Sequence, residues 1–360
     1  FIGKDNIVFH CIVFPSMLMA WNDAGREQYV LPENVPANEF LNFEGQKFSK
    51  SRGWGIDLQD FLKHFSADSL RYTLAINMPE SRDSDFYLKD YQARTNNELA
   101  DILGNFVNRT LAFAERTFKG VVPLVGPIGP LEKEMIALLA GAPAKVGSLY
   151  ERYKFREAVI ESMNVARAAN KYFNDGEPWK TSKSNLEQCA TTLNTCLQVV
   201  RSLAILMEPV VPVMAQKIWT TLNLEGLPGA AGWESAGELM LQPGHPLKKA
   251  EILVTKIEDK QIDDIIQALN SPAGPEQPKP AIEAKPKISI EDFKKVELRL
   301  ALVVSAERVP KSDKLLKIQV EIGSERRQIV AGIAQHYKPE DLVGKRIAVV
   351  ANLQPAKLMG

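Results

Sequence analysis

Residues 271–287 constrain the fold more than any other feature of this chain. The run reads SPAGPEQPKPAIEAKPK and holds five prolines in seventeen positions. Proline fixes one backbone dihedral and removes a donor, and the run has too few apolar side chains to form a core. We therefore interpret it as a semi-extended linker between separately folded parts, in preference to a long ordered loop. The chain length of 360 residues is compatible with about two or three domains.

The hydrophobic pattern before the linker is helical from residue 93 to residue 255. One apolar stripe emerges when successive residues are placed about 100° apart, formed by Leu99, Ile102, Leu103, Phe106 and Phe113. Further helices are predicted at 132–150, 154–174, 185–207 and 210–222. Helices in series with short connections indicate an antiparallel all-α bundle.

Beyond the linker the pattern changes to the period of a strand. Apolar residues alternate over 296–304 and 316–322, and more strands are predicted at 328–331 and 347–351. Closely spaced strands with turn residues between them indicate a small all-β barrel or sandwich over 288–360.

The first 92 residues mix short apolar runs with turn signals. Strands are predicted at 7–9, 29–31 and about 40–43, and helices at 12–19 and 68–76.

Charge is balanced overall but not along the chain. The 44 basic and 44 acidic residues cancel, so global charge predicts neither a nucleic acid nor a membrane as partner. Residues 288–360 hold thirteen basic and nine acidic residues, so a mildly basic tail follows an acidic body. The longest apolar runs fall short of the roughly 20 residues of a membrane-spanning helix, and no secretory signal is found.

Cysteine and histidine usage argues against a metal site. The three cysteines include no C-x-x-C pair, and the four histidines are too dispersed for a metal motif. No zinc site is therefore predicted within the chain. Cys189 and Cys196 lie in a helical apolar pattern, which favours two buried thiols of a cytosolic protein.

The segment Lys47-Phe48-Ser49-Lys50-Ser51 carries the sharpest chemical signal. Two ammonium groups can neutralise a triphosphate, while hydroxyl and backbone N–H groups bond its oxygens. A cationic loop of this kind stabilises the charge that moves when a phosphoryl bond breaks. Taken alone, however, the pattern also describes a solvated surface loop.

The surroundings of this loop resolve the ambiguity. KFSKS resembles the KMSKS signature of class I aminoacyl-tRNA synthetases, with Phe48 in place of the usual Met. The segments 1–10 and 14–18 upstream, and 67–72 and 83–86 downstream, are similar to methionyl-tRNA synthetases. The resemblance covers essentially the whole chain. It implies the C-terminal part of an α/β Rossmann-type catalytic domain at 1–92, an all-α anticodon-binding bundle at 93–255, a helix and linker at 256–287, and an all-β OB-fold at 288–360.

The resemblance also implies roles for residues of the first part. Lys47 and Lys50 would be catalytic, and ATP would be bound by Gly3, Asp5, Lys47, Ser49, Lys50 and Ser51. His10 and Phe14 would line the methionine pocket, where an aromatic wall suits a thioether. Without the motif, a buried core histidine and simple core packing are the better interpretations of His10 and Phe14.

A second set of candidate residues lies in the helical part. Asn105 and Arg109 are one turn apart, and Trp179 follows a helix stop. An amide, a guanidinium and an exposed indole suit unstacked RNA bases. Spacing alone favours a helix-capping amide, a solvated arginine and a core tryptophan. The resemblance implies instead that the three residues contact the methionine anticodon, C-A-U.

A third set lies in the basic tail. The resemblance implies a tRNA-binding OB-fold that also pairs two subunits, with RNA contacts from Lys311, Lys314, Lys317, Arg326, Arg327, Asn352 and Lys357. Phosphate attraction of this kind tolerates any sequence and falls steeply with salt. The alternative is a solvated charged surface.

Together these features predict a portion of a methionine–tRNA ligase in the cytoplasm, acting on methionine, ATP with Mg²⁺, and tRNA(Met), as a homodimer without a membrane. No two histidines are close enough for the HIGH motif of class I enzymes. We therefore expect this chain alone to be inactive. The alternative is a non-catalytic tRNA-binding or assembly protein derived from a synthetase.

Overall fold

The computed structural model describes residues 2–25, 28–49, 53–270, 289–310 and 312–354. The chain divides into two compact units, Phe1–Gly274 and Pro275–Gly360, and each is described by itself. The predicted linker at 271–287 lies outside the described residues.

The first part contains two short parallel strand pairs. β1 (Ile2–Gly3) pairs with β2 (Ala37–Asn38), and β3 (Leu41–Phe43) pairs with β4 (Ser84–Phe86). Helices α1 (Phe14–Asp23), α2 (Leu58–His64), α3 (Ala67–Ile76) and α4 (Leu88–Arg94) accompany these strands. The predicted helices at 12–19 and 68–76 and the strand near 40–43 are thereby confirmed. Pro15 lies in the first turn of α1, where a missing N–H costs nothing.

Two predicted strands of this part are wrong. Residues 7 and 8 are α-helical and continue into a π-helical turn, Phe9–Val13, and residues 29–31 form no strand. A three-residue apolar run fits a helix as well as a strand, so its periodicity could not distinguish them.

An aromatic core lies beneath β3 and β4. Phe43, Phe61, Phe86 and Tyr91 are buried against one another, with ring centroids 5.3 to 6.4 Å apart in the Phe61–Tyr91 and Phe61–Phe86 pairs. Asp57 starts α2 by accepting the N–H groups of the two residues after Leu58, at 2.8 and 3.1 Å. The helix cap and the aromatic core together fix the platform on which the signature loop stands.

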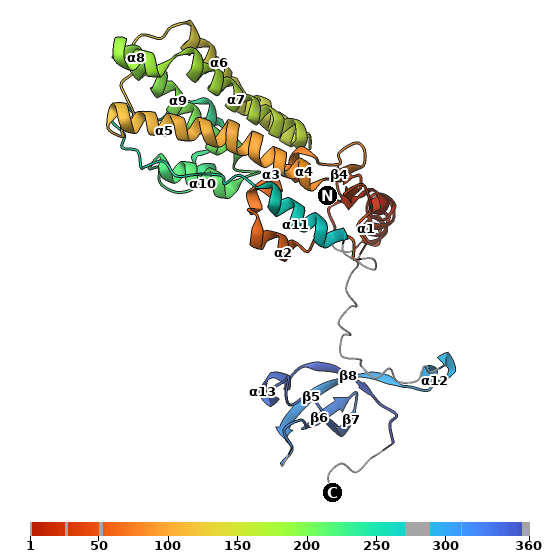
Figure 1. The fold of residues 1–360 in the computed structure, drawn as a ribbon. Helices are drawn as coiled ribbons and strands as arrows, with labels where there is room; N and C mark the ends of the chain where they lie inside the picture. The colour runs from red at the N-terminus through yellow and green to blue at the C-terminus, as the bar shows by residue number, and fades with distance from the viewer. Residues whose placement is uncertain (1, 26–27, 50–52, 271–288, 311, 355–360) are drawn as a thin grey trace. The chain divides into compact units, whose positions relative to one another are not determined.

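The helical bundle follows directly. Its elements are η4 (Thr95–Gly104, π-helical), α5 (Asn105–Phe118), α6 (Pro130–Glu151), α7 (Phe155–Asp175), α8 (Pro178–Ser184), α9 (Leu186–Met207), α10 (Pro212–Thr221), η5 (Pro228–Ala231) and η6 (Trp233–Gly237). Helix α9 contacts α5, α6, α7, α8 and α10, and it runs through the middle of the bundle (Figure 1). The bundle predicted from periodicity is confirmed.

Helix α9 is the core of the bundle. Every residue from Cys189 to Met207 is buried. By length and composition it is the one helix of the described residues that could cross a membrane, but its whole apolar window is buried within the protein. The predicted buried thiols are confirmed, and burial raises the pKa of both Cys189 and Cys196.

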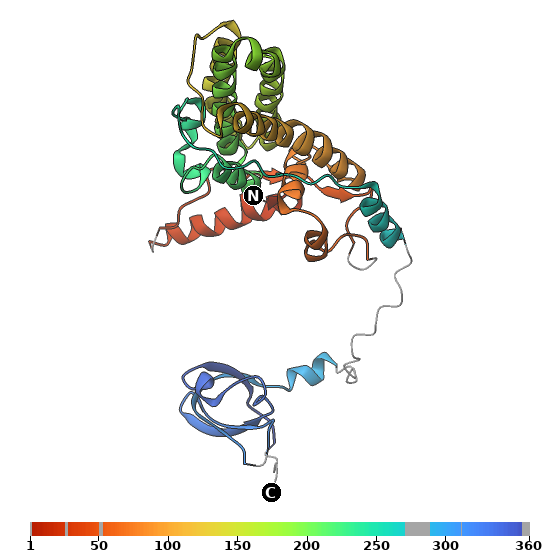
Figure 2. The ribbon, with the colours of Figure 1, turned by 60° about the vertical axis from the view of Figure 1, so that its left-hand side comes forward.

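Helix α11 (Asp259–Asn270) returns to the first part (Figure 2). Ile262 is fully buried in the aromatic core, and Lys89 on α4 pairs with Asp263 at 2.8 Å. The Asn96 side chain makes two hydrogen bonds to the backbone of Ile257. Its Oδ1 accepts from the N–H at 2.8 Å, and its Nδ2 donates to the carbonyl oxygen at 2.9 Å. The segment before the linker therefore packs with residues 41–96.

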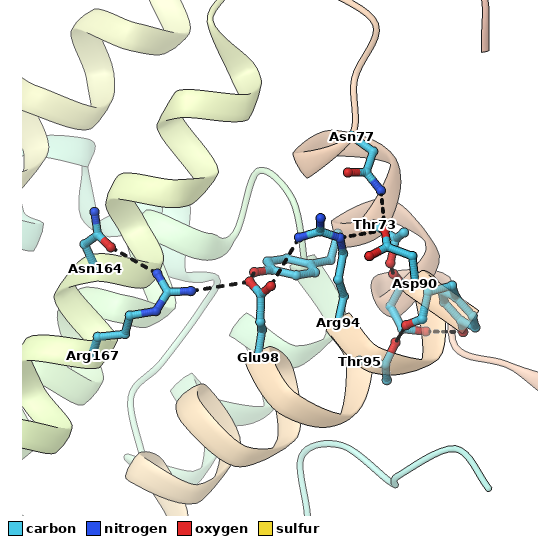
Figure 3. Close-up of polar contacts among 11 residues, drawn as sticks. Thr73, Asn77, Asp90, Arg94, Thr95, Glu98, Asn164 and Arg167 are labelled. Atoms are coloured by element: carbon cyan, nitrogen blue, oxygen red, sulfur yellow. Dashed lines mark hydrogen bonds and ion pairs between the residues drawn. The ribbon is translucent and has the colours of Figure 1, made fainter. Parts of the chain in front are cut away.

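A polar network joins α3 to the bundle (Figure 3). The Glu98 carboxylate accepts a hydrogen bond from the buried Tyr72 hydroxyl and pairs with Arg94 at 3.2 Å and with Arg167 of α7 at 3.5 Å. Arg94 also bonds Asp90 at 2.8 Å. These contacts tie four helical segments of the first unit together.

The tail is a four-stranded antiparallel sheet in the order β7-β6-β5-β8. Its elements are α12 (Ile290–Lys294), β5 (Leu298–Arg308), β6 (Leu316–Ile322), β7 (Glu325–Ala331), α13 (Pro339–Leu342) and β8 (Arg346–Val350). All four predicted strands are confirmed. Ala301, Val303, Leu316, Ile318 and Val320 form its core.

Strand β5 is apolar on both faces. Ala301 and Val303 face the core, whereas Leu298 and Leu300 on the opposite face are 59% and 70% exposed. The apolar residues that alternate over 296–304 therefore lie on the exposed face and not in the core.

Candidate functional site

The signature loop stands on a tight hairpin. Phe43 and Gln46 exchange two backbone hydrogen bonds, at 2.8 and 3.0 Å, across Glu44 and Gly45, which both have left-handed φ angles of 49° and 73°. Ser49 and Trp54 exchange two more, both at 2.9 Å. Lys47 thus lies between these two pairs of backbone hydrogen bonds, and Ser49 takes part in the second pair. Lys50 and Ser51 lie outside the described residues.

Phe48 anchors the loop. Its ring stacks on Phe43 at 5.6 Å and 21°, and the Trp54 indole donates to the Phe43 carbonyl at 3.0 Å. A small apolar cavity of about 190 Å³ lies beside Phe48. The substitution of Phe for the usual Met thus supplies a stacking contact at the base of the loop.

Lys4 connects the Gly3–Asp5 turn to the loop. Its ammonium group pairs with Asp83 at 2.7 Å and with Glu39, and it lies 4.4 Å from the centre of the Phe40 ring. The Lys47 ammonium lies 5.5 Å from the same ring. The hydrogen bonds that Lys4 donates to Asp83 and Glu39 raise the pKa of Lys4, and the bond to Asp83 lowers the pKa of that carboxyl group. The ammonium groups of Lys4, in the predicted Gly3–Asp5 turn, and of Lys47, in the signature loop, therefore lie near the same aromatic ring.

Gly3 lies close to the Asp5 side chain, which would have to shift slightly to admit a larger residue. A Cβ atom at this position would lie 3.0 Å from Oδ1 of Asp5, which is tighter than ordinary contacts. Asp5 is exposed, so its carboxylate is open to solvent beside the turn.

His10 and Phe14 lie one turn apart on a continuous helical stretch. Both are exposed, Phe14 by 52%, and Nδ1 of His10 lies 3.1 Å from the Asn6 carbonyl oxygen. Neither side chain is buried by the described residues of this chain. Neighbouring Ile12 and Met17 are also more than half exposed, so the two residues belong to an open apolar surface.

The end of the bundle brings Arg109 and Trp179 together. The Arg109 guanidinium lies over the Phe173 ring, 4.4 Å from its centre, and Nη2 donates to Oδ1 of Asn174 at 3.0 Å. The Trp179 ring lies 6.3 Å from Phe173, tilted by 34°. Trp179 is 40% exposed, so it is not a core tryptophan in this chain. Asn105 is also exposed and lies one turn before Arg109.

The chain between α7 and α8 sets the position of Trp179. Gly176 lies so close to α9 that a Cβ atom there would meet Cγ2 of Thr192 at 2.7 Å. Glu177 then adopts a left-handed φ of 41°, and Pro178 begins α8 in the following turn. Steric contact and backbone conformation together direct the indole toward Phe173.

Sequence reasoning missed Phe173 and Asn174. Phe173 fits the apolar stripe of α7 and Asn174 fits a helix stop, so neither carried a chemical signal of its own. Only the packing of α5 against α7 shows that both contact Arg109.

Most described cations of the tail set are paired. Lys317 pairs with Glu307 at 2.7 Å, Arg326 with Glu321 at 2.6 Å and Arg327 with Glu325 at 2.6 Å. In the part of the tail that the structure describes, Lys314 makes no ion pair. Lys311 and Lys357 lie outside the described residues.

Asn352 joins the two ends of the sheet. Its amide accepts the N–H of Glu297 at 2.9 Å and donates to the carbonyl oxygen of Lys295 at 2.5 Å. These bonds fix the start of β5 against the segment after β8. Among the residues described anywhere in the chain, no three metal-ligating side chains form a cluster.

Three protein families match successive stretches of the chain. Residues 1–111 match the family described as tRNA synthetases class I (M), and residues 122–272 match the anticodon binding domain of methionyl tRNA ligase. Residues 298–360 match a tRNA binding domain. A partial Rossmann-type domain with a signature loop, a helical anticodon domain and an OB-fold in this order define a class I aminoacyl-tRNA synthetase.

Curated relatives specify the family within this class. The methionine–tRNA ligase of Parabacteroides distasonis is 47% identical over 365 residues, which cover 100% of this chain and 52% of the relative. That of Salinibacter ruber is 44% identical over 384 residues, covering 100% and 53%. The chain corresponds to a C-terminal portion of methionyl-tRNA synthetases together with their tRNA-binding domain. It spans about half the length of the curated relatives it matches.

Solved structures agree. The apo form of Mycobacterium tuberculosis methionyl-tRNA synthetase superposes with a TM-score of 0.63 at 27% identity, covering 71% of this chain and 49% of that one. The same enzyme in complex with methionyl-adenylate gives 0.63 at 28% identity, covering 70% and 48%.

Proposed function

We propose that the whole protein is a methionine–tRNA ligase. It would join methionine to ATP, release pyrophosphate, and transfer the methionyl group from the adenylate to tRNA(Met). Lys47 and Lys50 would neutralise the phosphates, with Ser49 and Ser51 bonding their oxygens and Gly3 and Asp5 beside the nucleotide. Support comes from the described turn and loop, which share the Phe40 ring through Lys4 and Lys47.

Methionine and Mg²⁺ complete this proposal. His10 and Phe14 would border the methionine side chain on the exposed helical surface, where sulfur–aromatic contact is favourable. The magnesium ion would enter with ATP, held chiefly by phosphate oxygens. We place the protein in the cytoplasm, where its substrates are, in keeping with its free buried thiols. The ligase activity would belong to the whole protein, and this chain alone would be inactive.

The helical bundle would read the anticodon. The observation that carries this proposal is the cluster of Arg109, Phe173 and Trp179, which offers guanidinium donors and a solvent-exposed indole face side by side. Asn105 adds an exposed amide one turn away. These groups suit edge hydrogen bonds and stacking with unpaired bases.

Binding of short RNAs tests the anticodon proposal on this chain. We expect a stem-loop with the C-A-U anticodon to bind more tightly than stem-loops with one anticodon base changed, because base edges carry the sequence information. Fluorescence anisotropy of labelled RNAs measures the dissociation constants. Equal affinities for all the anticodons would refute anticodon reading by the bundle.

The tail would bind tRNA phosphates and pair two subunits. Five apolar residues of the tail are each more than half exposed, and we call them the tail patch: Ile290, Phe293, Leu298, Leu300 and Leu353. Exposed apolar surface of this kind marks an association site, and the family resemblance favours a second copy as the occupant. Among the described residues of the predicted RNA-binding set, Lys314 is the cation without a carboxylate partner, since Lys317, Arg326 and Arg327 are paired.

Charge in the tail patch should break the dimer. Leu300→Lys places an ammonium group in the proposed interface, and we expect sedimentation to show a shift from dimer to monomer. Leu124→Lys is the control, because Leu124 is 75% exposed in the other unit. A dimer that survives Leu300→Lys unchanged would exclude this face of β5 as the contact.

A further inference from the structure

We propose that Asn174 is a positioning residue of the anticodon site, which holds the Arg109 guanidinium in place without neutralising its charge. The inference rests on the proposed anticodon reading. It adds to that site a residue that keeps the Arg109 guanidinium in position and leaves its charge available to RNA. Asn174 would act through Arg109 and need not touch the RNA itself.

The geometry fixes the guanidinium from two directions. Phe173 lies beneath it, 2% exposed and held by Phe113, whose ring meets Phe173 edge-on at 6.2 Å and 83°. Asn174 accepts one N–H at 3.0 Å from the side. Arginine has five N–H donors in a rigid plane, so the remaining donors are free to meet an acceptor.

The group that accepts the hydrogen bond from Arg109 is a neutral amide. The neighbouring carboxylates are paired elsewhere, since Asp175 meets Lys171 at 3.1 Å and Glu177 meets Lys180 at 2.7 Å. Within the described part of the chain no carboxylate pairs with Arg109. A neutral amide therefore orients the guanidinium and leaves its full positive charge for RNA, in contrast to the paired cations of the tail.

A rigid, uncompensated guanidinium is what an RNA contact requires. Holding the side chain in advance removes part of the ordering cost of binding. Keeping the charge preserves attraction to phosphate or to a base acceptor, since hydrogen bonds to charged groups are stronger than neutral ones. A carboxylate at position 174 would hold Arg109 equally well but would cancel that charge.

The substitution Asn174→Asp separates these two effects. It keeps the size of the side chain and the acceptor, so Arg109 stays in place, but it adds a negative charge 3.0 Å from the guanidinium. We expect the 360-residue chain to bind the C-A-U stem-loop about tenfold more weakly, the scale of one charged hydrogen bond, with a shallower dependence of log affinity on log salt.

The structure provides a matched control. Asn164 on the same helix accepts a hydrogen bond from Arg167 at 3.0 Å, the same kind of contact away from the proposed site (Figure 3). Asn164→Asp makes the identical chemical change beside an arginine. We expect it to leave both the affinity and the salt dependence unaltered.

A double-mutant cycle gives the decisive result. With Arg109→Gln already present, Asn174→Asp should have little further effect on binding, because its influence passes through Arg109. An equal loss in both backgrounds, or no loss in either, would overturn the inference. Should the chain bind the C-A-U stem-loop selectively and respond to Trp179→Ala, yet ignore Asn174→Asp, only the positioning role fails. Absence of any C-A-U preference in the unaltered chain would instead refute the anticodon proposal on which the inference rests.

Discussion

Replacing Lys50 by alanine in the whole protein is expected to slow methionyl-adenylate formation by about 10²–10³-fold, the cost of removing one preorganised group that stabilises transition-state charge. The KM for methionine should change far less, because the lysine acts on the phosphates. Methionine-dependent ATP–pyrophosphate exchange, followed at varied methionine concentration, measures both effects.

A surface lysine near the same platform provides the control for this experiment. Lys63 on α2 is 67% exposed and pairs with Asp60 at 2.5 Å, so Lys63→Ala removes a cation without touching the loop. We expect its exchange rate to match that of the unaltered protein. Equal losses in rate and methionine affinity for Lys50→Ala would mean that Lys50 is only a ground-state contact.

Replacing Trp179 by alanine should weaken binding of the C-A-U stem-loop by roughly 1–3 kcal/mol, the range for one base–aromatic stack. That is about a 5- to 150-fold rise in the dissociation constant. The loss should be similar for altered anticodons, because an indole stacks on any base. Asn105→Ala should instead reduce discrimination between anticodons, since an amide reads base edges.

Trp179→Phe is the matched variant, because a phenyl ring keeps a stacking face in the same position. It should retain most of the affinity that Trp179→Ala loses. Thermal melting controls for folding, and the 40% exposure of Trp179 predicts only a small change in Tm for either substitution. A large drop in Tm for Trp179→Ala with no loss of stem-loop affinity would return Trp179 to a structural role.

Long periodic patterns predicted the fold well. The bundle helices and the four tail strands follow directly from apolar spacing, because each element buries a continuous face over several turns or pleats. The short run at 7–9 failed for the opposite reason, since three residues contain less than one helical turn. The return of α11 onto the aromatic core was not predictable either, because Ile262 gains its partners only through tertiary packing.

In the candidate site, too, local motifs could be predicted from the sequence and contacts between distant residues could not. The KFSKS motif could be recognised from five successive residues. The structure adds that Phe48 of this motif stacks on Phe43. Arg109 and Trp179 are far apart in sequence and were placed together only by resemblance. Their shared partner Phe173 had no signal beyond apolarity, and it required the contact of α5 with α7 to be found.

The most direct test of the central claim is ¹⁹F NMR of the chain labelled with fluorotryptophan. The chain contains five tryptophans, and Trp179→Phe identifies the signal of residue 179. On titration with the C-A-U stem-loop, we expect this signal to shift and to saturate with the binding curve, and a stem-loop with a changed anticodon to require a higher concentration for the same shift. If the Trp179 signal stays unchanged while the C-A-U stem-loop binds selectively, the anticodon is read elsewhere and the account is contradicted.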